Sequence, residues 1–191
     1  IFTDVSDAQA TEEKFKSLSN HSPSILHLAT HGFFLPDPKD KPNSVGENSY
    51  ALADDPLLRS GIIMAGANKA WSGEQIPLGV DDGIATAYEI AQLDLSKTQL
   101  VTLSACETAL GDLQGTEGVF GLQRAFKIAG VKNLIVSLWQ VPDKETSDLR
   151  RLYYQYLKKG NSKSEALAQA KKDFIKNNPL KSHPYYWSGF I

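Results

Sequence analysis

The sequence contains one cysteine, Cys106, which follows the short apolar run 100–103. Such a partly β-branched run is typical of a strand buried on both faces of a parallel sheet. A second apolar stretch, residues 24–30, leads into His31 and Gly32 in the same way. Ligands of open α/β sheets bind outside the carboxyl ends of the strands, and an imidazole beside a thiol can hold it as the nucleophilic thiolate. The pattern therefore predicts that Cys106 and His31 form a catalytic pair at one sheet edge.

Each candidate also has an interpretation without catalysis. Most lone intracellular cysteines are inert buried thiols, and a histidine at the position of His31 can be an ordinary strand-end residue. His27 lies in the middle of its strand, where we expect burial and a hydrogen bond, whereas His21 and His183 stand among polar turn residues and should be solvated. One cysteine and four histidines show no metal-ligand spacing, so we expect neither a metal site nor a cofactor.

Composition limits the classes of protein to which the chain can belong. With 191 residues, 41% hydrophobic and 22% charged, it is long enough to bury a core as one globular domain. A net charge of −2 argues against direct nucleic-acid binding or a membrane surface as the main partner. A single cysteine cannot form an internal disulfide, and no stretch resembles a signal peptide or a membrane span. We therefore expect a cytoplasmic location.

Strands and helices are expected to alternate along the chain. Hydrophobic periodicity and capping signals predict strands at 24–30, 98–104 and 132–139, and helices at 11–20, 86–93, 117–129, 143–158 and 162–176. An irregular segment spans 35–56, an extended or hairpin element follows within 57–68, and the aromatic C-terminal residues should pack as a short extended piece. Alternation at these lengths favours a right-handed parallel sheet covered on both faces.

The pattern of an apolar strand ending in His-Gly, followed much later by one ending in Ala-Cys, resembles the clan of cysteine peptidases that contains caspases, separases and gingipains. A finer resemblance is to the CHAT family, the caspase-like domains often joined to tetratricopeptide repeats. The matching blocks, in order, are residues 27–34 (HLATHGFF), 81–90 (DDGIATAYEI), 103–108 (LSACET), 118–130, 137–139 (SLW) and 185–187 (YYW).

The resemblance implies an α/β fold, a caspase-like three-layer sandwich with a mostly parallel central sheet and helices on both faces. The resemblance covers nearly the whole chain, and from it we expect residues 1–191 to form a single peptidase domain without the family's N-terminal strand region. It further implies hydrolysis of a protein or peptide, with Cys106 as nucleophile, His31 as its partner, and the backbone N–H groups of Gly32 and Cys106 as the oxyanion hole. A tetratricopeptide-repeat region or a regulatory protein would control the activity.

Substrate preference depends on a smaller part of the resemblance. Trp139 and Asp143 lie in a stretch that resembles the segment after the nucleophile strand of separases, where an acid in the primary pocket selects arginine. A basic residue before the cut is therefore one expectation, and the alternative is that Asp143 is only the N-cap of the next helix. Glu107, Asp81 and Asp82 are further acids expected near the same edge.

Two other classes of function are also compatible with these residues. A non-catalytic peptide-binding or scaffolding module would keep the caspase-like fold and bind a peptide without cutting it. A thiol-dependent acyl transferase or a redox sensor would use Cys106 for other chemistry. Labelling of Cys106, peptide cleavage and peptide binding distinguish these classes from a peptidase.

Overall fold

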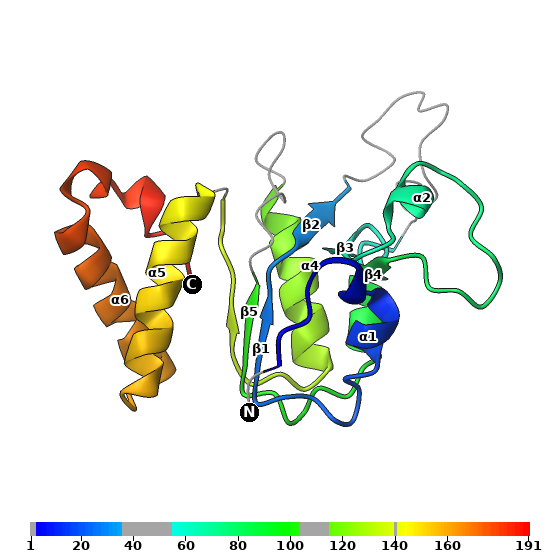
Figure 1. Cartoon of the computed structure of the whole chain (residues 1–191), viewed down its shortest axis with the longest axis horizontal. Helices are drawn as coiled ribbons and strands as arrows, with labels where there is room; N and C mark the ends of the chain where they lie inside the picture. The colour runs from blue at the N-terminus through cyan, green and yellow to red at the C-terminus, as the bar shows by residue number, and fades with distance from the viewer. Residues whose placement is uncertain (1–2, 36–54, 104–114, 140) are drawn as a thin grey trace. The chain divides into compact units, whose positions relative to one another are not determined.

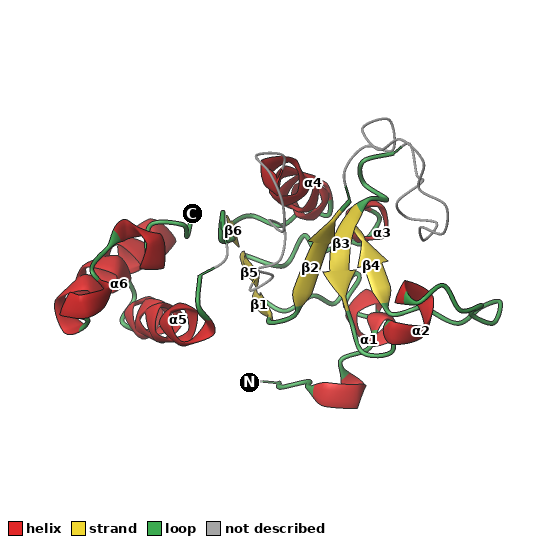
Figure 2. Cartoon of the chain, turned by 90° about the horizontal axis from the view of Figure 1, so that it is seen from above, coloured by secondary structure: helices red, strands yellow, loops and turns green. Residues whose placement is uncertain are grey.

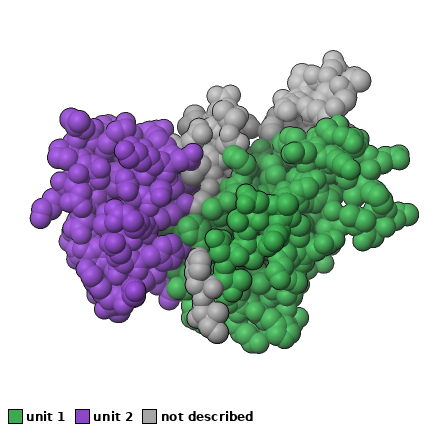
Figure 3. All heavy atoms as spheres, viewed as in Figure 1, with its two compact units in different colours: residues 1–136 green, residues 137–191 purple. Residues whose placement is uncertain are grey.

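The computed structural model describes residues 3–35, 55–103, 115–139 and 141–191, and for 115–120 it describes only the backbone. The chain divides into two compact units, Ile1–Val136 and Ser137–Ile191, which Figure 3 shows in green and purple. The single domain expected from the sequence stays a prediction.

A three-stranded parallel sheet lies in the first unit. It consists of β1 (Ile25–Leu28), β5 (Leu100–Leu103) and β6 (Leu134–Ile135), in the order β1-β5-β6. Strands β1 and β5 run side by side in the same direction (Figure 1). All four residues of the central strand β5 are buried, as the apolar run 100–103 predicted. These strands lie within the three segments predicted as strands and are shorter than expected, and their parallel pairing agrees with the predicted parallel sheet.

A second, antiparallel sheet was not predicted. It contains β2 (His31–Phe34), β3 (Ser60–Ile63) and β4 (Ile84–Thr86), in the order β2-β3-β4 (Figure 2). Buried Gly61 lies in the central strand, where an added Cβ would be 2.6 Å from the Ala85 carbonyl oxygen. The second sheet changes the expected position of His31, because the residue begins a new strand and does not end the first one.

Two helices of the first unit begin at predicted caps, Thr11 and Thr86. The helices of this unit are α1 (Glu12–Lys16), α2 (Asn68–Trp71), α3 (Ala87–Ala91) and α4 (Gly115–Ile128), with a 3-10 turn η1 at Asp7–Gln9. Thr86 and Glu89 form the expected capping box at the start of α3. Helices α3 and α4 pack together against the antiparallel sheet. A Cβ at Gly121 of α4 would lie 2.8 Å from the Ser60 hydroxyl oxygen, so this glycine permits a close approach of helix and sheet.

The second unit is built on two packed helices, α5 (Asp143–Lys158) and α6 (Lys163–Asn177), followed by 3-10 turns η3 (Pro179–Lys181) and η4 (Pro184–Tyr186). The bounds of α5 are those predicted from its amphipathic pattern. The capping box at Ser162 and Glu165 opens α6 as expected. The C-terminal residues were expected to pack as a short extended piece. Among them, Phe190 pairs with Ser137 as an isolated antiparallel bridge.

The fold class is therefore mixed α/β, and its parallel part agrees with the sequence. A three-layer caspase-like sandwich stays a prediction, because the described residues show two separate three-stranded sheets. None of the helices in this described part of the chain combines the length and apolarity needed to cross a bilayer.

Candidate active site

The parallel pairing of β1 with β5 brings two strand ends into register. Leu28, the last residue of β1, lies opposite Leu103, the last residue of β5. His31 is the third residue after Leu28, and Cys106 is the third residue after Leu103. Cys106 and Glu107 lie outside the described residues. The two strands that lead to the predicted dyad are thus neighbours that end level with each other.

His31 is exposed, whereas the next residue, Gly32, is buried. Both belong to β2, in which successive side chains point to opposite faces of the sheet. Their partners on β3 are Ile63 and Ile62. The hydroxyl of Thr30 donates a hydrogen bond to the Ile63 carbonyl and thereby ties the turn before His31 to β3. An imidazole exposed at the start of a paired strand is accessible for acid–base chemistry.

The prediction of a buried His27 was wrong, because its side chain is exposed. Strand β1 pairs only with β5 among the described strands, and one of its faces carries exposed Ile25 and His27, while Leu28 is buried. Alternation along the strand therefore places His27 on the open face. His21 and His183 are exposed, as expected.

Two of the acids expected near the strand ends, Asp81 and Asp82, make contacts with other parts of the first unit. Lys16 of α1 contacts carboxylate oxygens of Glu12 at 2.6 Å, Asp81 at 2.9 Å and Glu89 at 2.9 Å. Asp82 accepts a hydrogen bond from the Ile84 backbone N–H at 2.8 Å. Asp81 therefore joins α1 to the loop before β4. Sequence reasoning missed this cluster, although the i, i+4 spacing of Glu12 and Lys16 was a signal for it.

Burial and hydrogen bonding shift the pKa values of the cluster in opposite directions. Burial raises the pKa of Glu12 above its ordinary value of 4.5, although Lys16 and the Gly83 amide favour its carboxylate. Burial also opposes ionisation of Glu89, but hydrogen bonds from Lys16 and Thr86 outweigh it and lower the pKa of Glu89. Burial disfavours the Lys16 ammonium, yet its hydrogen bonds to the three carboxylates raise its pKa well above 10.5. The cluster thus keeps a cation bound between acidic groups.

The two expected pocket residues of the second unit have different surroundings. Trp139 is half-buried, and its indole N–H donates to the Tyr185 carbonyl at 2.9 Å. Asp143 is exposed and is the first residue of α5, while Pro142 is the N-cap and makes no side-chain cap. The alternative that Asp143 is the N-cap of α5 is therefore wrong by one residue. The carboxylate still lies in the first turn, where the helix dipole favours negative charge.

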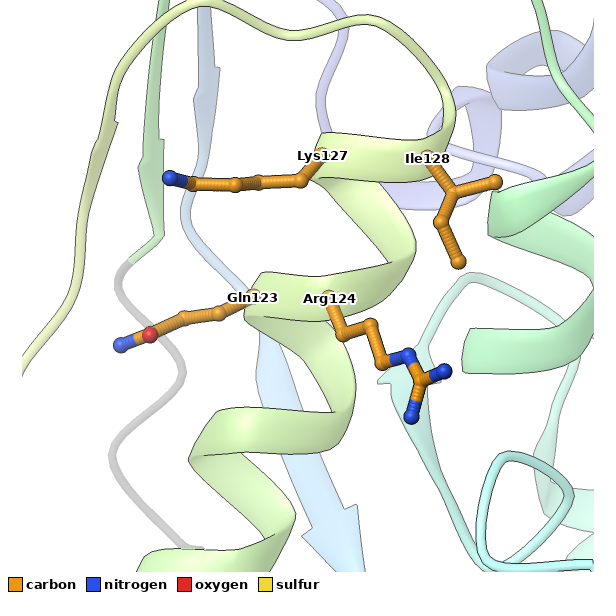
Figure 4. A pocket seen from close by; sticks show the side chains of 4 residues that line it. All are labelled: Gln123, Arg124, Lys127 and Ile128. Atoms are coloured by element: carbon orange, nitrogen blue, oxygen red, sulfur yellow. The ribbon is translucent and has the colours of Figure 1, made fainter.

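A hollow of ≈ 530 Å³ lies on α4, and its lining includes none of the residues that the sequence selected. It is lined by Gln123, Arg124, Lys127 and Ile128 (Figure 4). The close-up shows Gln123 and Lys127 extending to one side of the helix and Arg124 and Ile128 to the other. Because all four residues come from one helix, this hollow lacks the converging side chains of a catalytic pocket. Across the part of the chain that the structure describes, no three acidic, histidine or cysteine side chains form a group suited to a metal ion.

Comparison with known proteins places these elements in a wider context. The family model of the CHAT domain matches residues 5–191. Mouse tetratricopeptide repeat protein 28 is 28% identical over 188 residues, which are 96% of this chain and 8% of the mouse protein. Human tetratricopeptide repeat protein 28 is 32% identical over 108 residues, which are 56% of this chain and 4% of the human protein. The chain thus spans less than a tenth of either relative's length. Since the family model covers nearly all of its residues, the chain belongs to the CHAT domain family.

Proposed function

We propose that this chain is a cysteine endopeptidase of the caspase and separase type, with Cys106 and His31 as its catalytic dyad. The observation that carries the proposal is that Leu28 and Leu103 lie opposite each other at the ends of β1 and β5. His31 is the third residue after Leu28, and Cys106 is the third residue after Leu103. Strands β1 and β5 are adjacent and parallel, so their carboxyl ends lie at the same edge of the sheet. This edge is the usual site of chemistry in α/β folds. The exposed imidazole of His31 supports the same assignment.

Hydrolysis would proceed through an acyl-enzyme. The Cys106 thiolate attacks the scissile carbonyl carbon, and the backbone N–H groups of Gly32 and Cys106 stabilise the oxyanion. Collapse of the tetrahedral intermediate breaks the C–N bond while the His31 imidazolium gives its proton to the leaving amine. Water then attacks the thioester while His31 accepts a proton from it; the C–S bond breaks, the carboxylic acid leaves, and the Cys106 thiolate and His31 imidazolium are restored. Both steps use only a thiol, an imidazole and water.

The substrate would be a protein or peptide with a basic residue before the cut. An exposed carboxylate at Asp143, with Trp139 nearby in the chain and Glu107 next to the nucleophile, supports a preference for arginine or lysine. Tetratricopeptide repeat proteins are the relatives of this chain, so a repeat region or a regulatory protein is the proposed activating partner, in the cytoplasm.

The test is peptide hydrolysis by the parent chain and by two variants, Cys106→Ala and His31→Ala. We expect Cys106→Ala to abolish cleavage and His31→Ala to lower turnover by about 100-fold or more, as for a lost general acid or base. A thiol reagent reports on Cys106 alone, because the sequence contains no other cysteine. Cleavage by a folded Cys106→Ala protein would refute the dyad. Peptide binding without cleavage in the parent would instead indicate a scaffolding module, and thiol labelling without either would indicate a sensor.

A further inference from the structure

The residues that follow β6 are bound to the C-terminal end of the second unit. Ser137 forms an antiparallel bridge with Phe190, and the Leu138 N–H donates to the Gly189 carbonyl at 2.9 Å. The Trp139 indole N–H donates to the Tyr185 carbonyl at 2.9 Å. Three consecutive residues, one of them a proposed pocket residue, therefore take their positions from residues 179–190, which we call the C-terminal segment.

Gly189 allows the indole ring of Trp139 to lie directly on the backbone. An added Cβ at Gly189 would be 2.8 Å from Trp139 Cε2 and 3.1 Å from both Cδ2 and Cζ2. A contact shorter than 3.0 Å requires something to shift, and all three of these nearest atoms belong to the Trp139 ring. Movement of the ring would displace the indole N–H from the Tyr185 carbonyl. The absence of a side chain at Gly189 is thus what permits this position of Trp139.

The same segment is bound to the start of α5, where Asp143 lies. Lys181 forms a 3.1 Å ion pair with Glu145, a buried residue in the first turn of the helix. The Lys181 ammonium also lies 4.6 Å from the centroid of the Tyr186 ring. Both proposed pocket residues of the second unit, Trp139 and Asp143, therefore lie on structure held by the C-terminal segment.

The segment itself is anchored to both long helices of the unit. Lys171 of α6 donates to the Phe190 carbonyl at 2.7 Å, and the Arg150 guanidinium of α5 lies 5.8 Å from the Phe190 ring centroid. Phe190 is 1% exposed. Within the segment, the Trp187 indole N–H donates to the Ser182 carbonyl at 3.0 Å. A segment fixed at so many points can hold a contacting side chain in one orientation.

We propose that the C-terminal segment is a positioning element for substrate recognition, which sets the orientation of Trp139 through Gly189 and Tyr185. The inference rests on the proposed function, since Trp139 is one of its pocket residues. The segment contributes to binding of the peptide and leaves the thiol chemistry of Cys106 unchanged. Displacing the Trp139 ring from its contacts with Gly189 and Tyr185 should therefore raise KM and weaken peptide binding, while kcat and labelling by a small thiol reagent stay near the parent values.

The experiment compares Gly189→Ala, which displaces the ring, with Trp139→Phe, which keeps an aromatic ring but removes the N–H. Ser188→Ala is the matched control. It changes the residue next to Gly189 and removes one hydrogen bond, from the Ser188 hydroxyl to the Pro184 carbonyl. The Trp139 indole resonance in ¹⁵N-labelled protein reports the ring position independently of activity. Cleavage of a peptide library gives KM and kcat, iodoacetamide reports Cys106, and retention of the library on Cys106→Ala protein, with and without Gly189→Ala, reports binding.

We expect a shifted indole resonance and a KM raised by about tenfold or more in Gly189→Ala, with kcat and alkylation within about threefold and Ser188→Ala unchanged. An unshifted resonance, or a shifted one with KM unchanged, would overturn the inference while the peptidase stands. If the parent retains peptides without cutting them and Gly189→Ala loses them, the peptidase fails and the inference holds. A library neither cut nor retained overturns both. If Gly189→Ala does not fold, Trp139→Phe gives KM, kcat, alkylation and peptide retention, and the same changes in KM and retention are expected because it removes the hydrogen bond to the Tyr185 carbonyl.

Discussion

Replacement of Lys16 by methionine should strongly destabilise the first unit. The Lys16 ammonium contacts three carboxylates, those of Glu12, Asp81 and Glu89, at 2.6 to 2.9 Å. These groups come from α1, from the loop before β4 and from α3, so one side chain connects α1 to residues 65 and 73 positions further along the chain. Methionine retains much of the apolar stem of lysine but leaves the three carboxylates facing one another without a cation.

The expected loss follows from how deeply each contact is buried. The Asp81 and Glu89 side chains are 30% and 35% exposed, so each contact is worth roughly 0.5–1 kcal/mol. Glu12 is 2% exposed, and loss of a charged partner for a buried group costs about 1–3 kcal/mol. Glu12 keeps the Gly83 amide at 2.8 Å, and protonation can relieve part of the remaining cost. We therefore expect the free energy of unfolding to fall by about 3 kcal/mol.

Urea unfolding at pH 7, followed by circular dichroism, measures this loss by linear extrapolation. Lys14→Met is the matched control, because it removes the same charge from an exposed position on the same helix, and it should cost less than about 0.5 kcal/mol. A loss below about 1 kcal/mol for Lys16→Met, or one equal to that of Lys14→Met, would refute the view that this cluster stabilises the unit.

Three further outcomes are expected. The pKa of Glu89 is lowered, so its carboxylate stabilises the fold above pH 4.5 and this contribution is lost as the pH falls. Glu89→Gln should therefore flatten the dependence of the free energy of unfolding on pH between about 5 and 3. An unchanged slope would contradict this expectation. Asp143→Asn should change the free energy of unfolding by less than about 1 kcal/mol, since Asp143 interacts only with the helix dipole. The same change should reduce cleavage after arginine far more than it reduces alkylation of Cys106. Equal cleavage by parent and variant would exclude Asp143 from the pocket. Gly61→Ala should cost about 2 kcal/mol or more in a thermal or urea transition, because its Cβ would meet the Ala85 carbonyl at 2.6 Å; a neutral change would show that the strand can shift.

Local features of the molecule were predictable from the sequence because their causes lie within a few residues. The buried strand β5 followed from the apolar run 100–103, and both capping boxes, at Thr86 and Ser162, followed from residue types spaced three apart. Helix α5 began and ended where its amphipathic pattern did. The candidate dyad was also visible in the sequence, since Cys106 and His31 each follow such an apolar run.

Tertiary structure alone decided which segments pair. The antiparallel sheet joins three short strands, β2, β3 and β4, whose hydrogen bonds form between residues far apart in the chain, and no local pattern specifies such pairing. For the same reason the exposure of His27, the partners of Lys16 and the contact of Trp139 with Gly189 were not predicted. Each depends on backbone and side chains that only long-range packing brings within contact distance, whereas capping and periodicity act within a single turn or strand.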